Sequence, residues 1–313
     1  MPLALLSLVA AGVAAAHEEH ALDAGRLPSA DAWNAVTALS LVLLAIWYVF
    51  GLRRLWAHRA GRAVIPVWRV LAFGAGVAAT AIALLSTLDR SSDTLFSAHM
   101  VQHEILILVS APLMVFGRPF IAAVWALGPP FRRVVVRILR DPWLARLWQR
   151  LSGPFTVLLL HAVVLWGWHL PWMFELALHH EGIHVIQHLS FFLTAALFWW
   201  ALIHGRYGRI GYGAGILYVF GTALHSEVLS ALLTFDSRPL YATHALRTAA
   251  HGLEPIADQQ LAGVLMWVPF GAVFVVIGLS LFAAWLGEAE RRVTANECRR
   301  AASLAGDKTF RLG

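Results

Sequence analysis

The sequence predicts an all-α membrane protein built as a bundle of seven transmembrane helices. The chain has 313 residues, of which 59% are hydrophobic and 13% are charged, a balance far from that of an ordinary soluble domain. Several apolar runs approach the roughly 20 residues that a helix needs to cross a bilayer. None of these runs alternates between apolar and polar residues as a barrel strand does, so we expect helical spans.

Seven runs have the length of a span. In chain order they cover residues 34–52, 66–87, 95–116, 154–170, 183–203, 211–234 and 261–286. The first sixteen residues form a shorter apolar segment that ends in Ala14-Ala15-Ala16 before a polar stretch, which is the pattern of a cleavable signal peptide. Residues 17–33 would then form a periplasmic N-terminal segment.

Positively charged residues are concentrated in every second link. The links after the first, third, fifth and seventh runs, together with Arg69 at the edge of the second run, contain 20 of the 24 Lys and Arg residues. By the positive-inside rule the N-terminus lies outside and the tail, residues 288–313, is cytoplasmic. The formal charge of +6 therefore reflects topology, and we expect no nucleic-acid partner.

The two longest links differ in character. The inner link, residues 117–153, contains a basic segment at 131–151 in which Arg is interleaved with Val, Ile, Leu and Trp. This pattern predicts a helix that lies in the cytoplasmic interface against anionic lipid, with a partner-docking element as the alternative. The outer link, residues 235–260, has too many polar and helix-breaking residues for a span, and we expect it to cover the outer face.

Histidine is the residue type that points to a function. His99 and His103 lie four apart at the start of the third run, and His184 and His188 repeat this spacing at the start of the fifth. The spacing places two rings on one face of a helix, about 6 Å apart along the axis, so both can reach one metal ion. Ionisable side chains at membrane depth are costly and by default mark a functional site.

Further polar residues accompany the two pairs. His169 ends the fourth run and His225 lies in the sixth, so four spans bring imidazole toward one outer pocket. The predicted metal ligands are His99, His103, His184, His188, His169 and His225. A ligating histidine needs a partner for its other ring nitrogen, and the candidate supporting residues are Glu104, Glu227, Asp258, Gln259 and Met100. Histidines of the links, such as His244, are equally well explained as exposed loop residues.

Copper is the expected metal, with zinc or haem as alternatives. Imidazole suits zinc, copper or iron, and a thioether from Met100 would favour Cu(I). The single cysteine, Cys298, lies in the predicted cytoplasmic tail, so an outer site has no thiolate. His103-Glu104 begins like the zinc protease motif H-E-x-x-H, but residue 107 is Ile107, so the motif is absent. We therefore do not expect an enzyme.

Four ordered motifs carry a family resemblance. They are HMVQH followed by a hydrophobic run to SAPLMVFGRP (residues 99–119), WHLPWMFELAL (168–178), HVIQHLSFF (184–192) and DQQLAGVLMWVP (258–269). Together they resemble the CtaG-type cytochrome c oxidase assembly factors, which are seven-span membrane proteins of bacteria. The resemblance implies a role in assembling a haem-copper oxidase at the inner membrane. It also implies that the two histidine pairs form the polar site, with His169, Asp258 and Gln259 near it.

The sequence as a whole predicts an assembly factor whose outer pocket binds copper and delivers it to a nascent oxidase subunit. That subunit, or other assembly factors, would be its partner within the lipid bilayer. An intramembrane zinc-dependent hydrolase, in which zinc-bound water is the nucleophile, is one alternative. A haem-binding membrane protein is another, and a structural scaffold without metal is a third.

Overall fold

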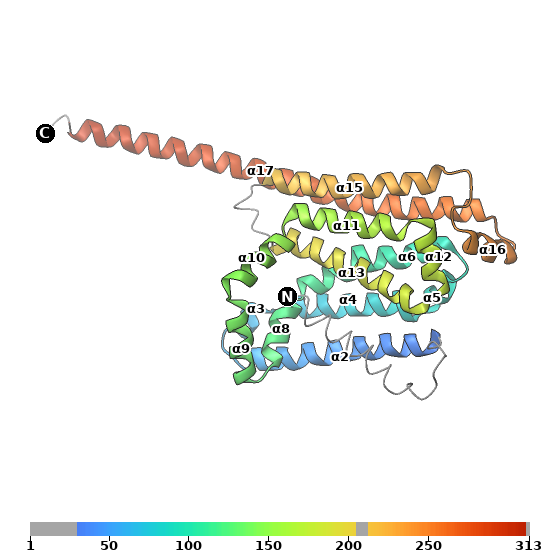
Figure 1. The fold of residues 1–313 in the computed structure, drawn as a ribbon. Coiled ribbons are helices and arrows are strands. Elements are labelled where there is room, and N and C mark those ends of the chain that lie inside the picture. The colour runs from blue at the N-terminus through green and yellow to red at the C-terminus, as the bar shows by residue number, and fades with distance from the viewer. Residues whose placement is uncertain (1–29, 205–211, 311–313) are drawn as a thin grey trace.

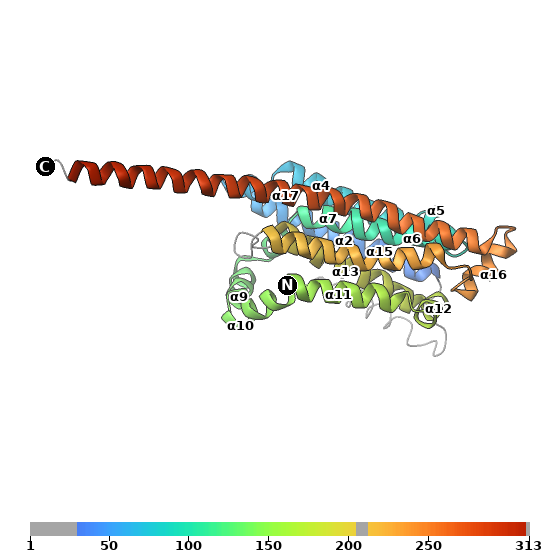
Figure 2. The ribbon, with the colours of Figure 1, turned by 90° about the horizontal axis from the view of Figure 1, so that it is seen from above.

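The computed structural model describes residues 30–204 and 212–310, and within these ranges every regular element is a helix. The predicted signal peptide, residues 1–16, lies outside the described residues, as does most of segment 17–33. The long helices run side by side to form an elongated bundle (Figures 1 and 2). The predicted helical bundle is thereby confirmed for the described part of the chain.

Six segments are long and apolar enough to cross a membrane, and a seventh qualifies if two bent helices count as one span. The clear spans are α2 (Ala30–Trp56), α4 (Val67–Leu85), α13 (Glu181–His204), α15 (Tyr212–Phe235), α17 (Pro255–Phe310) and a composite of three short helices. The composite consists of α6 (Phe96–Glu104), the π-helix η1 (Ile105–Ser110) and α7 (Ala111–Phe116). These segments match six of the seven predicted runs to within a few residues at most of their ends.

The remaining predicted span is shorter than expected. Helix α11 (Pro154–Trp168) has 15 residues, which at 1.5 Å per residue gives roughly 22 Å and falls short of a typical bilayer core. It qualifies only together with α10 (Pro142–Leu151), from which it is bent by 54°. Pro154 begins α11 after Gly153 and ends any continuation of the preceding helix.

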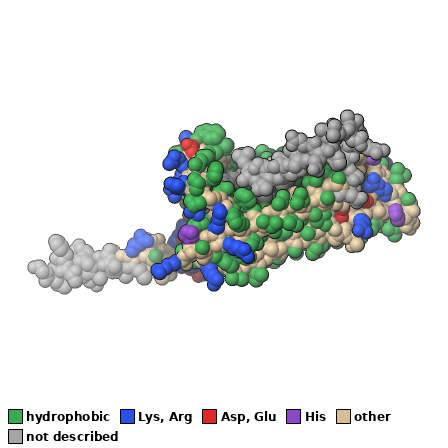
Figure 3. Space-filling view, turned by 90° about the horizontal axis from the view of Figure 1, so that it is seen from below, with side chains coloured by type: hydrophobic (Ala, Val, Ile, Leu, Met, Phe, Trp, Pro, Cys, Tyr) green, Lys and Arg blue, Asp and Glu red, His purple; other side chains and the backbone are tan. Residues whose placement is uncertain are grey.

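Short helices form the two ends of the bundle. The basic end contains α3 (Gly61–Val64), α8 (Pro119–Ala126), α9 (Pro129–Leu139) and α10. The opposite end, which we call the histidine end, contains α5 (Thr87–Ser92), α12 (Pro171–His179) and α16 (Ala242–Ala250). Arg and Lys side chains gather toward the basic end and its tail, while hydrophobic side chains cover the flank between the ends (Figure 3). The cytoplasmic placement of the basic end stays a prediction.

The predicted basic segment is helical. Helices α9 and α10 cover most of it, and neither contains a buried residue. Large apolar side chains such as Phe131 and Trp143 are more than half exposed. This composition is typical of helices that lie in a membrane interface.

Two hydrophobic cores hold the bundle together. The larger core joins α6, α11, α12, α13, α15 and α17 and includes Met100, Phe174 and Phe198. A smaller core joins α2, α4 and α8, where Tyr48 stacks on Phe73 with ring centroids 3.8 Å apart. Gly51 of α2 is required there, because a Cβ atom would lie 1.9 Å from the carbonyl oxygen of Ala122.

The last helix is longer than its predicted span. Helix α17 begins at Pro255, includes Pro269, and continues to Phe310 without a break. Its final turns project beyond the bundle (Figures 1 and 2). The predicted tail, residues 288–313, is therefore helical over the part that the structure describes.

Candidate metal centre

The first turn of α6 is held in place by a carboxylate from the far end of the chain. Leu95 precedes the helix, and its apolar side chain cannot accept hydrogen bonds from the free N–H groups of the first turn. Instead, Asp258 of α17 accepts hydrogen bonds from the backbone nitrogens of Phe96 and Ser97, at 2.7 and 3.2 Å, and from the Ser97 hydroxyl. A negative charge at a helix N-terminus also interacts favourably with the helix dipole. Asp258 thus sets the position of α6.

Three buried imidazoles from α6 and α13 converge at the histidine end. Each of His99, His103 and His188 offers one ring nitrogen, and these nitrogens lie within 4.8 Å of one another. A tetrahedral ion bound at about 2.0 Å would hold its ligand atoms about 3.3 Å apart, so small side-chain rotations would close the triad on one ion. We call His99, His103 and His188 the histidine triad.

Two further imidazoles border the triad. The ring of His184 stacks on that of His99 at 5.2 Å and lies 4.3 Å from that of His188. The ring of His244, from α16, lies 5.7 Å from that of His99. Both predicted His-x-x-x-His pairs therefore meet in one cluster. Sequence reasoning missed His244, which is 2% exposed rather than a solvated loop residue.

The triad contains polar atoms that packing alone leaves without partners. Within the described residues, both ring nitrogens of His99 and of His103 are buried with no hydrogen bond, and so is Nε2 of His188. Leaving buried polar atoms unpaired costs about 1–3 kcal/mol each, and native proteins rarely do so without a reason. A metal ion would satisfy one nitrogen of each ring.

His169 lies beside this cluster, at the turn between α11 and α12. It is close enough to His103 for their charges to interact. Its Nδ1 is 2.7 Å from the carbonyl oxygen of Leu165, while its Nε2 is buried and unpartnered within the described chain. Burial lowers the pKa of His169 to about 4, and burial also lowers the pKa of His244 to about 4. Both rings are therefore neutral at neutral pH, which is the form that binds metals.

His225 lies elsewhere. Its Nε2 is 3.4 Å from Nδ1 of His161, so α15 and α11 contribute a separate histidine pair. No ring contact joins His225 to the triad among the residues that the structure describes. The predicted ligand set is thus divided between two places, because His225 faces α11 rather than α6.

The predicted supporting residues have several different roles. Glu104 and Glu227 are close enough for their charges to interact, and the carboxylate of Glu227 fills the space beside Gly271 of α17. Gln259 binds the link before α16, since its Oε1 accepts from Leu240 N at 2.7 Å and its Nε2 donates to Arg238 O at 3.1 Å. Met100 is fully buried in the larger core.

A π-helix directly follows the first histidine pair. Pro112 lies at the start of α7 and has no N–H for the carbonyl of Leu108, so the regular α-helical bonding pattern cannot continue there. The widened turn exposes the carbonyl of Ile107, which accepts a 2.8 Å hydrogen bond from Nε1 of Trp199 on α13. Such turns often mark functional sites, and this one joins the two helices that supply the triad.

The fold and the centre define a polytopic helical membrane protein with a buried cluster of histidines at one end. The model of the cytochrome c oxidase caa3 assembly factor family (Caa3_CtaG) matches residues 46–288. The chain belongs to this family. The resemblance that the motifs of the sequence indicated is thereby confirmed.

Curated relatives come from mycobacteria. An uncharacterized protein of Mycobacterium leprae is 26% identical over 286 residues, which cover 88% of this chain and 42% of the relative. An uncharacterized protein of Mycobacterium bovis is 28% identical over 276 residues, covering 85% of this chain and 40% of the relative. The chain therefore spans about two-fifths of the length of the curated relatives it matches. No solved structure matches the chain.

Proposed function

We propose that the protein is an inner-membrane assembly factor that binds copper in the histidine triad and delivers it to a nascent cytochrome c oxidase subunit. The observation that carries this proposal is the convergence of three buried imidazoles from α6 and α13 whose nitrogens lack hydrogen-bond partners in the described chain. Membership in a family of cytochrome c oxidase assembly factors supports an oxidase subunit as the recipient. The histidine end is the outer end in this proposal, in agreement with the positive-inside rule.

The donor set suits transfer of a metal rather than its permanent retention. All the triad donors are imidazoles, and imidazole binds copper without the stronger attachment that a thiolate provides. His184 and His244 border the triad, so an ion could move between neighbouring imidazoles by ligand exchange. In this transfer the bonds from copper to the imidazoles are exchanged for bonds from copper to ligands of the recipient. No covalent bond of the recipient changes, and the proposed role is therefore not enzymatic.

The packing of the cluster disfavours a haem site. A haem held by two histidines requires the flat macrocycle to lie between the two rings. In this cluster the ring centroids of neighbouring histidines are 4.3 to 5.9 Å apart, so the rings would have to move apart to hold a porphyrin between them. This packing favours a single ion over a macrocycle.

Metal analysis of the purified protein tests the proposal. We expect about one copper per chain, no Soret band, and loss of copper in the double variant His103→Ala/His188→Ala. His251→Ala is the matched control, because His251 is an exposed histidine at the same end and its loss should leave the copper content unchanged. His225→Ala reports on the separate pair and should also retain copper.

Three outcomes would overturn the proposal. Zinc in place of copper, with hydrolysis of a lipid amide, would favour the hydrolase. A Soret band would favour a haem protein. Equal copper content in the wild type and in the double variant would show that the triad does not hold the metal.

A further inference from the structure

We infer that copper reaches the histidine triad through the cavity between α2, α4 and α13, and that three carboxylates at the mouth of this cavity attract the cation. This inference rests on the proposed function, because it names the route to the same centre. We call Asp89, Asp93 and Glu181 the acidic mouth.

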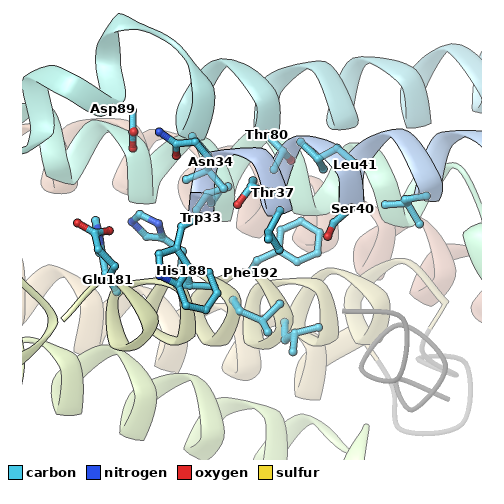
Figure 4. A pocket seen from close by; sticks show the side chains of 18 of the residues that line it. Trp33, Asn34, Thr37, Ser40, Leu41, Thr80, Asp89, Glu181, His188 and Phe192 are labelled. Atoms are coloured by element: carbon cyan, nitrogen blue, oxygen red, sulfur yellow. The ribbon is translucent and has the colours of Figure 1, made fainter. Parts of the chain in front are cut away.

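The cavity connects the acidic mouth to the histidines. It has a volume of about 220 Å³, and its lining includes all three carboxylates together with His184 and His188. Figure 4 shows Asp89 and Glu181 at one end of the cavity with His188 beside them. A volume of this size holds several water molecules, so a hydrated or partly hydrated ion has room to enter.

The side chains that line the cavity become less exposed from the acidic mouth to the triad. Asp93 and Glu181 are exposed, Asp89 and His184 are half-buried, and His188 is 8% exposed. The Nε2 atoms of both histidines are buried without a hydrogen-bond partner among the described residues. The lining thus changes from charged oxygen at the surface to unpaired nitrogen at the triad.

The three carboxylates act on a cation together. Glu181 is close enough to both Asp89 and Asp93 for their charges to interact. In the part of the chain that the structure describes, none of the three forms a salt bridge. Arg90 acts electrostatically on Asp89, and Arg247 acts on Asp93 and Glu181. The guanidinium of Arg247 donates to the backbone oxygen of Asp93 rather than to a carboxylate, and Asp89 Oδ1 accepts a 2.9 Å hydrogen bond from the neutral amide of Gln102. The acidic mouth therefore keeps its negative charge available to an incoming ion.

The remaining lining strengthens this attraction. Apolar side chains such as Leu41, Leu189 and Phe192 form most of the wall. Low-dielectric walls around charges of one sign focus the electric field and raise the association rate of an ion by about 10- to 1,000-fold. A second cavity, beside His244, holds only about 10 Å³, close to the minimum for one water molecule, and offers no comparable route.

Two kinds of variant separate attraction from passage. In the triple variant Asp89→Asn/Asp93→Asn/Glu181→Gln, copper(I) should load about tenfold more slowly at low salt, with an unchanged release rate and a weaker dependence on ionic strength. In Thr37→Trp, which places a large ring in the cavity from α2, loading and release should slow by the same factor. The equilibrium affinity should then stay unchanged, because a barrier does not alter the two end states.

The experiment uses the purified full-length protein in detergent with copper(I). Competition with a chromogenic chelator gives the dissociation constant, and capture of released copper by excess chelator gives the release rate constant. The loading rate constant is the release rate constant divided by the dissociation constant. Glu254→Gln is the control for the carboxylates, since Glu254 is exposed and lies outside the cavity lining. Leu39→Trp is the control for Thr37→Trp, since Leu39 is 56% exposed on α2.

The outcomes distinguish this inference from the proposed function. If the wild type binds copper through the triad but Thr37→Trp exchanges it as fast as Leu39→Trp, the route is wrong and the centre stands. If the carboxylate variant loads as fast as Glu254→Gln, attraction by the acidic mouth is wrong. If the wild type binds no copper at equilibrium, the proposed function fails and the route fails with it.

Discussion

Replacing Asp258 should destabilise the protein far more than replacing an ordinary helix-capping carboxylate. Asp258 accepts hydrogen bonds from two backbone N–H groups and one hydroxyl at the start of α6, and its side chain is largely buried. A hydrogen bond to a charged group contributes about 1.5–3 kcal/mol, and buried donors left unpaired add to the loss. We therefore expect Asp258→Ala to lower the free energy of unfolding by about 3–5 kcal/mol.

Asp141 provides the matched control. It also accepts from two backbone N–H groups, those of Trp143 and Leu144 at the start of α10, but it is exposed. Water replaces the lost acceptor there, so Asp141→Ala should cost about 1 kcal/mol. Unfolding of the detergent-solubilised variants, followed by tryptophan fluorescence, measures both values.

The same substitution should weaken metal binding. His99 lies in the first turn of α6, two residues after Ser97, which Asp258 holds, so a frayed first turn would move one histidine of the triad. We expect lower copper affinity in Asp258→Ala and unchanged affinity in Asp141→Ala. Equal loss of stability in the two variants would refute the reasoning that burial makes the Asp258 contacts strong.

Two further predictions concern helix packing and pH. Gly263→Ala should destabilise by about 2–3 kcal/mol, because its Cβ would lie 2.7 Å from the backbone nitrogen of Thr234. Gly278 has open space around it, so Gly278→Ala should be neutral or stabilising by up to about 1 kcal/mol. Thermal denaturation compares the two glycine variants, and equal melting temperatures would contradict the close contact between α15 and α17. Burial lowers the pKa of both His169 and His244 to about 4, so below pH 6.5 the unfolded chain binds more protons than the native one. The stability of the metal-free protein should therefore fall as pH decreases from 6.5 to 4, by about 3 kcal/mol for each histidine. His244→Gln should make this decline shallower, and an identical pH profile would argue against a buried neutral ring.

The sequence by itself determined the class of the protein and most of its spans. Hydrophobic length is a local property, so α2, α4, α13 and α15 lie close to the runs that the sequence predicts. The fourth span was the exception. Its apolar run ends at the turn before Pro171, and only the structure shows that 15 residues of helix are bent against α10 rather than extended. The π-helix had one local signal, Pro112.

Histidine spacing is also local, and it correctly indicated which residues of one helix share a face. Whether two helices turn those faces toward each other is not local. The convergence of His99 and His103 with His188 depends on the packing of α6 against α13. The inclusion of His244 and the separation of His225 depend on α16 and α11 in the same way.

Asp258 shows most clearly that some contacts depend on the tertiary structure alone. Its contacts with the start of α6 join residues about half the chain apart, separated by 161 and 162 positions, and no periodicity in the sequence connects them. The sequence determined a membrane bundle with two His-x-x-x-His patterns, because helix length and ring spacing follow from local geometry. Only the tertiary structure decided which imidazoles meet, which carboxylate holds them in place, and which cavity leads to them, because these depend on contacts between distant segments.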